Sequence, residues 1–272
     1  MIYKSFSFGK ATAQGYFIEN SPEIHLERKR HLAIICPGGG YEMTSDREAE
    51  PIALKYLSHD ISCVVLRYSV SPNRFPDSLC ELASCVAFFR KNHETYGINP
   101  NKICLIGGSA GGHLAASLGV FWHEKFLNDL LNTNSEDIKP NTLILSYPVI
   151  SSAEYAHQGS FIALLGEDFQ NKKEFLSLEK RVNEKTPRTF LWHTADDDYV
   201  PVENTFLFAS ALSKYKIPFE VHVYPTGIHG LATASYMTGN YPQINIPHCQ
   251  DWIEKSIEFL KGKTSFEEDT LF

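Results

Sequence analysis

The chain has 272 residues, of which 43% are hydrophobic and 21% are charged, and its formal net charge is −7. This composition excludes a disordered chain, and the length suits one α/β domain with a substantial core. The negative net charge offers no attraction to nucleic acid or to an anionic membrane, and no apolar run is long enough to cross a bilayer. Residues 1–6 contain no basic segment followed by a long apolar run, so we expect no signal peptide and a cytoplasmic location.

The six cysteines favour reduced thiols over a disulfide framework. Three of them stand inside apolar runs typical of buried strands, and none forms a Cys-x-x-Cys pair. Neither His93 nor His123, each followed by glutamate, belongs to a His-Glu-x-x-His zinc motif. We therefore expect neither a metal site nor a cofactor.

The first part of the chain predicts an antiparallel pair followed by alternating strands and helices. Residues 2–8 and 12–18 are aromatic and alternating, as in a two-stranded start. Residues 61–68 are almost continuously apolar, which is typical of a parallel strand covered on both faces. The other elements expected are a strand at 31–36, helices at 48–58 and 77–93, a turn at 98–102 and a strand at 102–106.

The second part continues this alternation and contains one long insertion. Residues 151–187 have weak periodicity and several aromatics, and we expect a small cap there because so long a loop is usually functional. Residues 263–272 are polar and acidic and are expected to be frayed. The pattern predicts a single domain over 1–272, with a mostly parallel central sheet and helices on both faces. The remaining elements expected are helices at 110–120, 202–215 and 249–261 and strands at 142–147, 188–193 and 219–224.

The strongest functional signal is the turn Ile-Gly-Gly-Ser-Ala-Gly-Gly-His at residues 106–113. A serine between a strand and a helix is held in a strained conformation that projects Oγ from the sheet, and flanking glycines allow the close backbone approach. A dinucleotide fingerprint would need glycine at Ser109, and a phosphate-binding P-loop would need lysine at His113. We therefore interpret Ser109 as a nucleophile.

A serine nucleophile needs a base and an acid, and two later loops supply candidates. The strand at 188–193 leads to three adjacent aspartates at 196–198, and the strand at 219–224 leads to His229 between two nearby glycines. Both loops follow the carboxyl ends of predicted parallel strands, where open α/β sheets bind ligands. The order Ser, Asp, His is that of α/β-hydrolases. His229 is the candidate base, whereas His113 is interpreted as a packed helix residue and His193 as the end of a strand.

On these residues the chain resembles α/β-hydrolase serine esterases from about residue 30 to residue 260. Residues 37–41, 47–51 and 107–114 are similar to small bacterial hydrolases described as acetylesterases, xylan-esterase-like enzymes or sugar-ester hydrolases, which neighbour the hormone-sensitive-lipase-like esterases. The resemblance implies the α/β-hydrolase fold and hydrolysis of short-chain carboxylic esters, above all acetyl esters, with acetylated sugars as possible substrates.

The resemblance also selects among the aspartates. The family pattern His-Gly-x-x-Asp-x-x-Val-Pro, laid on His193 and Val200, selects Asp197 as the acid. Asp196 is the second candidate and Asp198 a distant third. Thr194 replaces the glycine of the pattern.

The glycine triplet after the strand at 31–36 is predicted to form an oxyanion hole. Its donors would be the backbone N–H groups of Gly38 and Gly39, together with that of Ala110. Related esterases have His-Gly-Gly-Gly here, whereas this chain has Pro37 in the histidine position. Main-chain donors do not require that histidine.

Three further residues are candidates for the substrate pocket. Tyr41 and Tyr147 follow strands at the same end of the sheet and are expected to form pocket walls. Arg47 is a candidate contact for a polar substrate group. The acidic Glu48 and Glu50 are interpreted as residues that favour the start of a helix.

These observations predict a serine hydrolase that forms an acyl-enzyme with a small-molecule ester. One alternative is an amide or peptide hydrolase using the same triad, as in formamidases or prolyl-oligopeptidase-like enzymes. The other is a non-catalytic binding protein on a hydrolase scaffold. The oligomeric state is left open.

Overall fold

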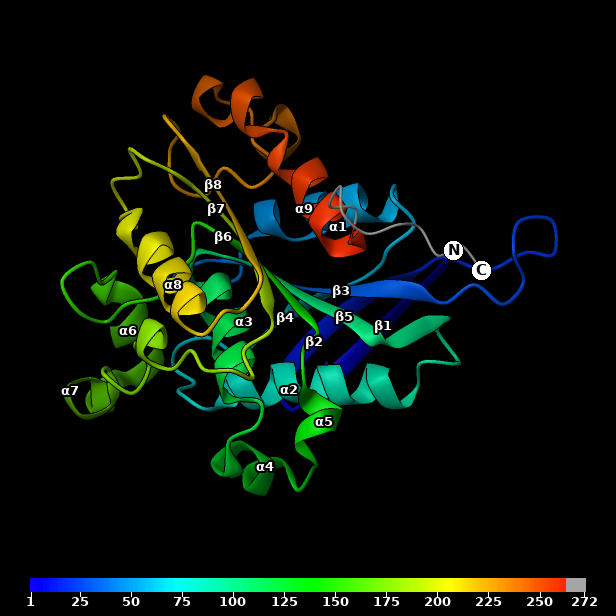
Figure 1. Ribbon diagram of the computed structural model, residues 1–272, viewed down its shortest axis with the longest axis horizontal. Helices are drawn as coiled ribbons and strands as arrows, with labels where there is room; N and C mark the ends of the chain where they lie inside the picture. The colour runs from blue at the N-terminus through cyan, green and yellow to red at the C-terminus, as the bar shows by residue number, and fades with distance from the viewer. Residues whose placement is uncertain (263–272) are drawn as a thin grey trace.

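The computed structural model describes residues 1–262 and contains a central sheet of eight strands (Figure 1). The strand order is β1-β2-β4-β3-β5-β6-β7-β8. β1 and β2 pair antiparallel, β2 pairs antiparallel with β4, and all other neighbours are parallel. The strands are β1 (Ile2–Phe8), β2 (Ala11–Phe17), β3 (Arg30–Cys36), β4 (Ser62–Arg67), β5 (Ile98–Gly108), β6 (Thr142–Ser146), β7 (Arg188–Thr194) and β8 (Phe219–Tyr224).

Helices cover both faces of the sheet, as predicted. Along β3, Leu32 and Ile34 pack into the same core as α2, α3 and α8, whereas Ala33 and Ile35 pack with α1 and α9. Figure 1 shows α1 and α9 above the sheet and α2 and α3 below it. The α-helices are α1 (Glu50–Leu57), α2 (Asp77–Lys91), α3 (Ser109–Phe121), α4 (Lys125–Leu131), α5 (Ser135–Ile138), α6 (Gln158–Leu165), α7 (Phe169–Lys172), α8 (Glu203–Lys214) and α9 (Trp252–Lys261).

Short 3-10 turns complete the connections. They are η1 (Asp46–Glu48), η2 (Gly166–Asp168), η3 (Leu178–Lys180), η4 (Tyr236–Thr238), η5 (Pro242–Ile244) and η6 (Pro247–Cys249). Within residues 1–262, no helix combines the length and the apolar character needed to cross a bilayer.

Two predicted elements differ from those observed. The turn expected at 98–102 is part of β5, because Ile98 pairs with Arg30 before an irregularity in the register. The helix expected at 48–58 is divided into η1 and α1, with Pro51 in the first turn of α1, where its missing N–H costs nothing. α4 and α5 have no counterpart among the predicted elements.

The segment 151–187 lies between β6 and β7 and contains α6, η2, α7 and η3. His157, the N-cap of α6, and Gly159 line the same pocket as Ser109. That the segment works as a cap, and that the chain is one domain, stay predictions. The tail predicted to be frayed, residues 263–272, lies outside the described residues.

Candidate active site

Ser109 occupies a sharp turn between β5 and α3. Its φ is 52°, which confirms the strained conformation predicted for this serine. A Cβ added at Gly107 would lie 2.2 Å from the Gly111 carbonyl oxygen, and one at Gly111 would lie 2.0 Å from the Cys36 carbonyl oxygen. Only glycine fits at these two positions, because the end of β5, the start of α3 and the end of β3 approach one another closely there.

The structure brings the three predicted residues together in one hydrogen-bonded chain. His229 Nε2 lies 2.9 Å from Ser109 Oγ, and His229 Nδ1 lies 2.7 Å from Asp197 Oδ2. A carboxylate only accepts, so Nδ1 carries the imidazole proton and Nε2 is free to accept from the serine hydroxyl. This arrangement can remove a proton from Ser109.

The Asp197 carboxylate is buried, and both of its oxygen atoms have hydrogen-bond partners. Its Oδ1 accepts from the backbone N–H groups of Tyr199, at 3.0 Å, and Val200, at 2.9 Å. Burial favours a raised pKa, but hydrogen bonds from His193 and His229 outweigh it and hold the pKa of Asp197 well below its ordinary value. Asp197 is therefore an ionised acceptor at neutral pH.

The neighbouring aspartates have other surroundings. Asp196 is exposed and its Oδ1 accepts from the Gly227 N–H at 2.8 Å, while Asp198 is also exposed. Asp197 is thus the aspartate in contact with His229.

Sequence reasoning missed His193 as part of this site. His193 is fully buried; its Nε2 donates to the Val200 carbonyl at 2.9 Å and lies 3.3 Å from Asp197 Oδ2. Its Nδ1 lies 2.8 Å from Thr205 Oγ1. The sequence signal for this contact is the spacing His-x-x-x-Asp between His193 and Asp197.

The glycine triplet is arranged differently from the prediction. The Gly38 N–H donates to Glu48 Oε2 at 2.6 Å, so the prediction that Gly38 supplies an oxyanion donor is wrong. The Gly38 carbonyl accepts from Ser45 N at 2.8 Å, and the Gly39 carbonyl accepts from Met43 N at 3.1 Å.

These carbonyl contacts decide where the remaining N–H groups point. Because C=O and N–H point oppositely in a trans peptide, the N–H groups of Gly39 and Gly40 face away from those partners. Within residues 1–262 neither N–H has a hydrogen-bond acceptor, and both glycines line the pocket beside Ser109. Ala110 lies in the first turn of α3, where backbone N–H groups have no intrahelical partner. The available donors are Gly39, Gly40 and Ala110.

The pocket above Ser109 has a volume of about 490 Å³. Arg47 lines it and donates to the Tyr241 hydroxyl at 2.5 Å, while a contact between Arg47 and a polar substrate group stays a prediction. The exposed ring of Tyr199 lies 5.6 Å from the His229 ring and 4.8 Å from the His157 ring, centroid to centroid. The pocket mouth therefore carries an aromatic face beside the candidate base.

Tyr41 and Tyr147 are not pocket walls, and that prediction is wrong. Their φ values are 60° and 37°, and both side chains are almost fully buried. A position after a strand does not reveal this left-handed backbone or the burial of the side chain. Tyr41 donates to His113 Nδ1 at 2.9 Å, and His113 Nε2 donates to the Leu176 carbonyl at 3.0 Å, which confirms His113 as a packed helix residue.

Glu48 is also buried, with 6% of its surface exposed, instead of capping a helix. Its carboxylate accepts from Gly38 N and, at 2.6 Å, from the Tyr147 hydroxyl. The helix-start interpretation of Glu48 is therefore wrong. A buried carboxylate is unusual, and no pattern of residues around Glu48 predicts it.

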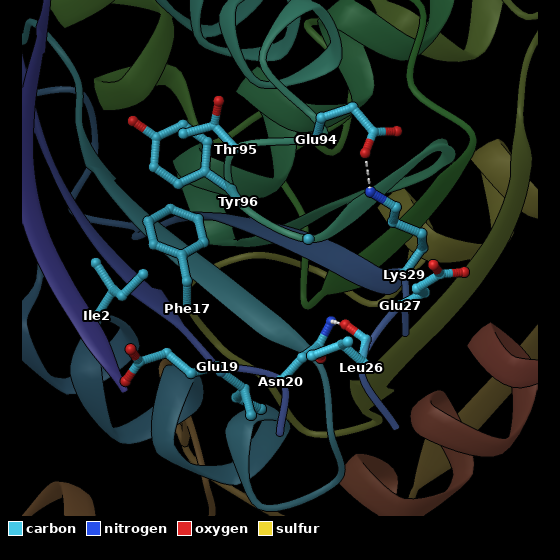
Figure 2. Close-up of a pocket in the computed structure, with 12 residues that line it drawn as sticks. Ile2, Phe17, Glu19, Asn20, Leu26, Glu27, Lys29, Glu94, Thr95 and Tyr96 are labelled. Atoms are coloured by element: carbon cyan, nitrogen blue, oxygen red, sulfur yellow. Dashed lines mark hydrogen bonds and ion pairs between the residues drawn. The ribbon is translucent and has the colours of Figure 1, made fainter. Parts of the chain in front are cut away.

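A second hollow, of about 590 Å³, is lined by a different set of residues (Figure 2). Its wall includes Phe17 and Tyr96, and an ion pair between Lys29 and Glu94 lies across it. Neither Ser109 nor His229 borders this hollow. The candidate active site is the pocket at the carboxyl ends of the parallel strands.

Comparisons with known proteins agree with this fold. The BD-FAE family matches residues 22–212. Endo-1,4-beta-xylanase B of Butyrivibrio fibrisolvens is 38% identical over 216 residues, which cover 76% of this chain and 33% of that protein. Acetylxylan esterase of Xylanibacter ruminicola is 27% identical over 207 residues, covering 74% of this chain and 41% of that protein. The chain thus spans less than half the length of these two relatives.

A solved structure is similar over nearly the whole chain. The acetyl ester-xyloside bifunctional hydrolase from Caldicellulosiruptor lactoaceticus is 36% identical with a TM-score of 0.80, covering 93% of this chain and 88% of that one. With the sheet described above, this similarity confirms the predicted α/β-hydrolase fold.

Proposed function

This chain belongs to the BD-FAE family, and from that premise we propose that it is a serine carboxylic-ester hydrolase acting through an acyl-enzyme. The observation that carries the proposal is the continuous contact from Ser109 through His229 to Asp197. This chain of contacts lies beside the N–H groups of Gly39 and Gly40, which have no hydrogen-bond acceptor among the described residues, in a pocket large enough for a small ester. Binding alone would not require a nucleophile, a base and an acid in this register.

The proposed reaction uses only this chain's own groups and requires no cofactor. His229 Nε2 takes the proton of Ser109 Oγ as the oxygen attacks the ester carbonyl. The N–H groups of Gly39, Gly40 and Ala110 donate to the oxyanion of the tetrahedral intermediate. His229 then protonates the leaving alcohol, and the acyl group stays on Ser109. A water molecule, deprotonated by His229, releases the acid by the reverse sequence.

We propose short acyl groups, above all acetyl, as the substrates, with acetylated sugars as the alcohol component. The names of the two relatives, a xylanase and an acetylxylan esterase, support this assignment. The exposed Tyr199 ring supports it as well, because a flat aromatic face at a pocket mouth can pack against a sugar ring.

The test is an acyl-chain series of p-nitrophenyl esters, followed by acetylated xylo-oligosaccharides and an aminoacyl p-nitroanilide. We expect kcat/KM to be highest for acetate and propionate, because a chain that outgrows the pocket causes steric strain. A steady rise from acetate to decanoate would contradict the short-chain assignment. Faster anilide than ester cleavage would favour the amide hydrolase, and no labelling of Ser109 by a fluorophosphonate would favour a binding protein.

A further inference from the structure

We infer that Glu48 is a positioning residue whose buried carboxylate, through Gly38 and Tyr147, holds the oxyanion-binding glycines and the His229 loop in one fixed arrangement. The inference rests on the proposed ester hydrolysis. Nothing in the triad chemistry itself uses this carboxylate, yet its contacts join two parts of the site that come from distant segments of the chain.

The carboxylate lies directly beneath the nucleophile turn. Its Oε2 accepts from Gly38 N at 2.6 Å, and its Oε1 accepts from the Tyr147 hydroxyl at 2.6 Å. A Cβ added at Gly108 would lie 2.5 Å from Glu48 Oε1, so the residue before Ser109 leaves just enough room for it.

On the oxyanion side, one peptide unit is held at both ends. The Pro37 carbonyl accepts from the Tyr68 hydroxyl at 2.7 Å, and the N–H of the same unit, that of Gly38, donates to Glu48. The next peptide carries the Gly39 N–H. Fixing the Pro37–Gly38 plane therefore limits the directions in which Gly39 can point its donor.

On the histidine side, Tyr147 extends the contact to the loop that carries the base. Its hydroxyl oxygen accepts from Ala232 N at 2.9 Å, three residues after His229. Burial and the nearby Glu48 charge raise the pKa of Tyr147 well above its ordinary value. The hydroxyl therefore stays protonated and donates a hydrogen bond to Glu48. The Ala232 carbonyl accepts from Trp252 Nε1 at 2.9 Å, so the same residue is held at both its N–H and its C=O.

Ala232 needs such anchors because its own backbone is strained. Its φ is 52°, in the left-handed region that a residue with a Cβ rarely adopts. Without the hydrogen bond from Ala232 N to the Tyr147 hydroxyl, this strained conformation would be less stable. The position of His229 relative to Ser109 would then vary.

The consequence concerns the transition state more than substrate binding. Oxyanion donors act only when they already point at the position of the charged oxygen, and losing one donor costs about 10²–10³-fold in kcat. A misdirected donor should cost less than a missing one. Loss of the Glu48 contacts should therefore lower kcat by about 10- to 100-fold and leave KM nearly unchanged.

The test compares Glu48→Gln with Glu50→Gln, a matched control two residues away whose exposed carboxylate accepts from Tyr16. Glutamine turns one acceptor into a donor, so it cannot accept from both Gly38 and Tyr147. The measurements are kcat and KM for p-nitrophenyl acetate and the Ki of a methyl trifluoromethyl ketone, whose serine adduct places an oxyanion in the hole. For Glu48→Gln we expect Ki to rise by the same factor by which kcat/KM falls, and for Glu50→Gln no change.

Tyr147→Phe is the second variant, because it removes only the hydroxyl and keeps the ring that packs 5.0 Å from the Trp192 ring. We expect about a tenfold loss of kcat in this variant. In the double variant Glu48→Gln with Tyr147→Phe, the loss of kcat should be smaller than the product of the two single losses, since both changes act through one contact. If Glu48→Gln fails to fold, Tyr147→Phe decides.

Two outcomes separate this inference from the function on which it rests. Wild-type kcat and Ki in a folded Glu48→Gln, or in Tyr147→Phe where only that variant folds, would overturn the positioning role while leaving ester hydrolysis intact. A wild-type protein that neither hydrolyses esters nor binds the ketone would refute the proposed function, and this inference with it.

Discussion

Replacing Asp197 by asparagine tests the proposed triad most directly, because the change keeps the size of the side chain. In the structure, Asp197 Oδ1 accepts two backbone N–H groups and Oδ2 faces the N–H groups of His229 and His193. The asparagine oxygen can keep the two backbone contacts. Its NH₂ group would then meet two imidazole donors where an acceptor is required.

The change that avoids this meeting of hydrogen-bond donors at the lowest free-energy cost is a change of tautomer in His229. With the proton moved to Nε2, Nδ1 can accept from the asparagine, but Nε2 then presents a hydrogen to Ser109 and cannot act as a base. Only the minority of molecules with the correct tautomer would react, and the imidazolium would lose its counter-charge. Comparable changes in other triads cost roughly 10³–10⁴-fold in kcat, equivalent to about 4–5.5 kcal/mol of transition-state stabilisation.

The measurement is kcat for p-nitrophenyl acetate in Asp197→Asn, with Asp196→Asn and Asp198→Asn as controls that change the same charge in the same loop. We expect each control to lose less than about tenfold, because exposed single contacts contribute little. A nearly inactive Asp196→Asn beside an active Asp197→Asn would refute the assignment of the acid.

Three further expectations follow from the structure. Ser109→Ala should lose about 10⁶-fold in kcat with an unchanged urea-unfolding midpoint, since one hydroxyl is removed; substantial activity in the folded variant would contradict the nucleophile assignment. Burial lowers the pKa of His113 to about 4. The unfolded imidazole titrates near 6.5, so the stability that depends on neutral His113 is complete above about pH 6.5 and falls by up to about 3 kcal/mol as pH drops to 4. Urea unfolding at pH 7, 5.5 and 4 should show this slope, and His113→Gln should reduce but not abolish it, because burial also lowers the pKa of His31 to about 4. Tyr199→Ala should lower kcat/KM more for acetylated xylo-oligosaccharides than for p-nitrophenyl acetate, and equal losses would argue against a sugar contact.

The order of elements could be predicted from the sequence because parallel strands are buried on both faces and leave long apolar runs. The Ser109 turn was recognisable because its glycines stand within three residues of the serine, although the Gly111 contact that requires glycine comes from the distant strand β3. The loops of Asp197 and His229 could be placed because the carboxyl ends of parallel strands share one edge of the sheet.

The errors have a common physical origin. Which glycine of the triplet supplies an oxyanion donor depends on Glu48, ten residues later, and no periodicity reports that a glutamate will be buried. Tyr41 and Tyr147 follow strands at the pocket end of the sheet, but their hydroxyl groups bind the buried His113 and Glu48, and no local sequence pattern reports these distant partners. Tertiary contacts, rather than local preference, decided each of these positions.

The distribution of left-handed backbone also bears on how this protein can adapt to heat. Among the described residues, eight non-glycine positions have a positive φ, and five of them, Tyr41, Ser109, Tyr147, Ala232 and Ala234, belong to the loops around the pocket. Each such conformation costs on the order of 1–3 kcal/mol, which the rest of the fold must offset. Selection for thermostability alone would therefore first replace these strained backbone conformations with unstrained ones. The same substitutions would lower kcat, because the strained loops position the residues around the pocket. Variants that gain heat resistance and keep their activity should instead carry their substitutions at the opposite edge of the sheet, in β1, in β2 and in α2, which packs against β1.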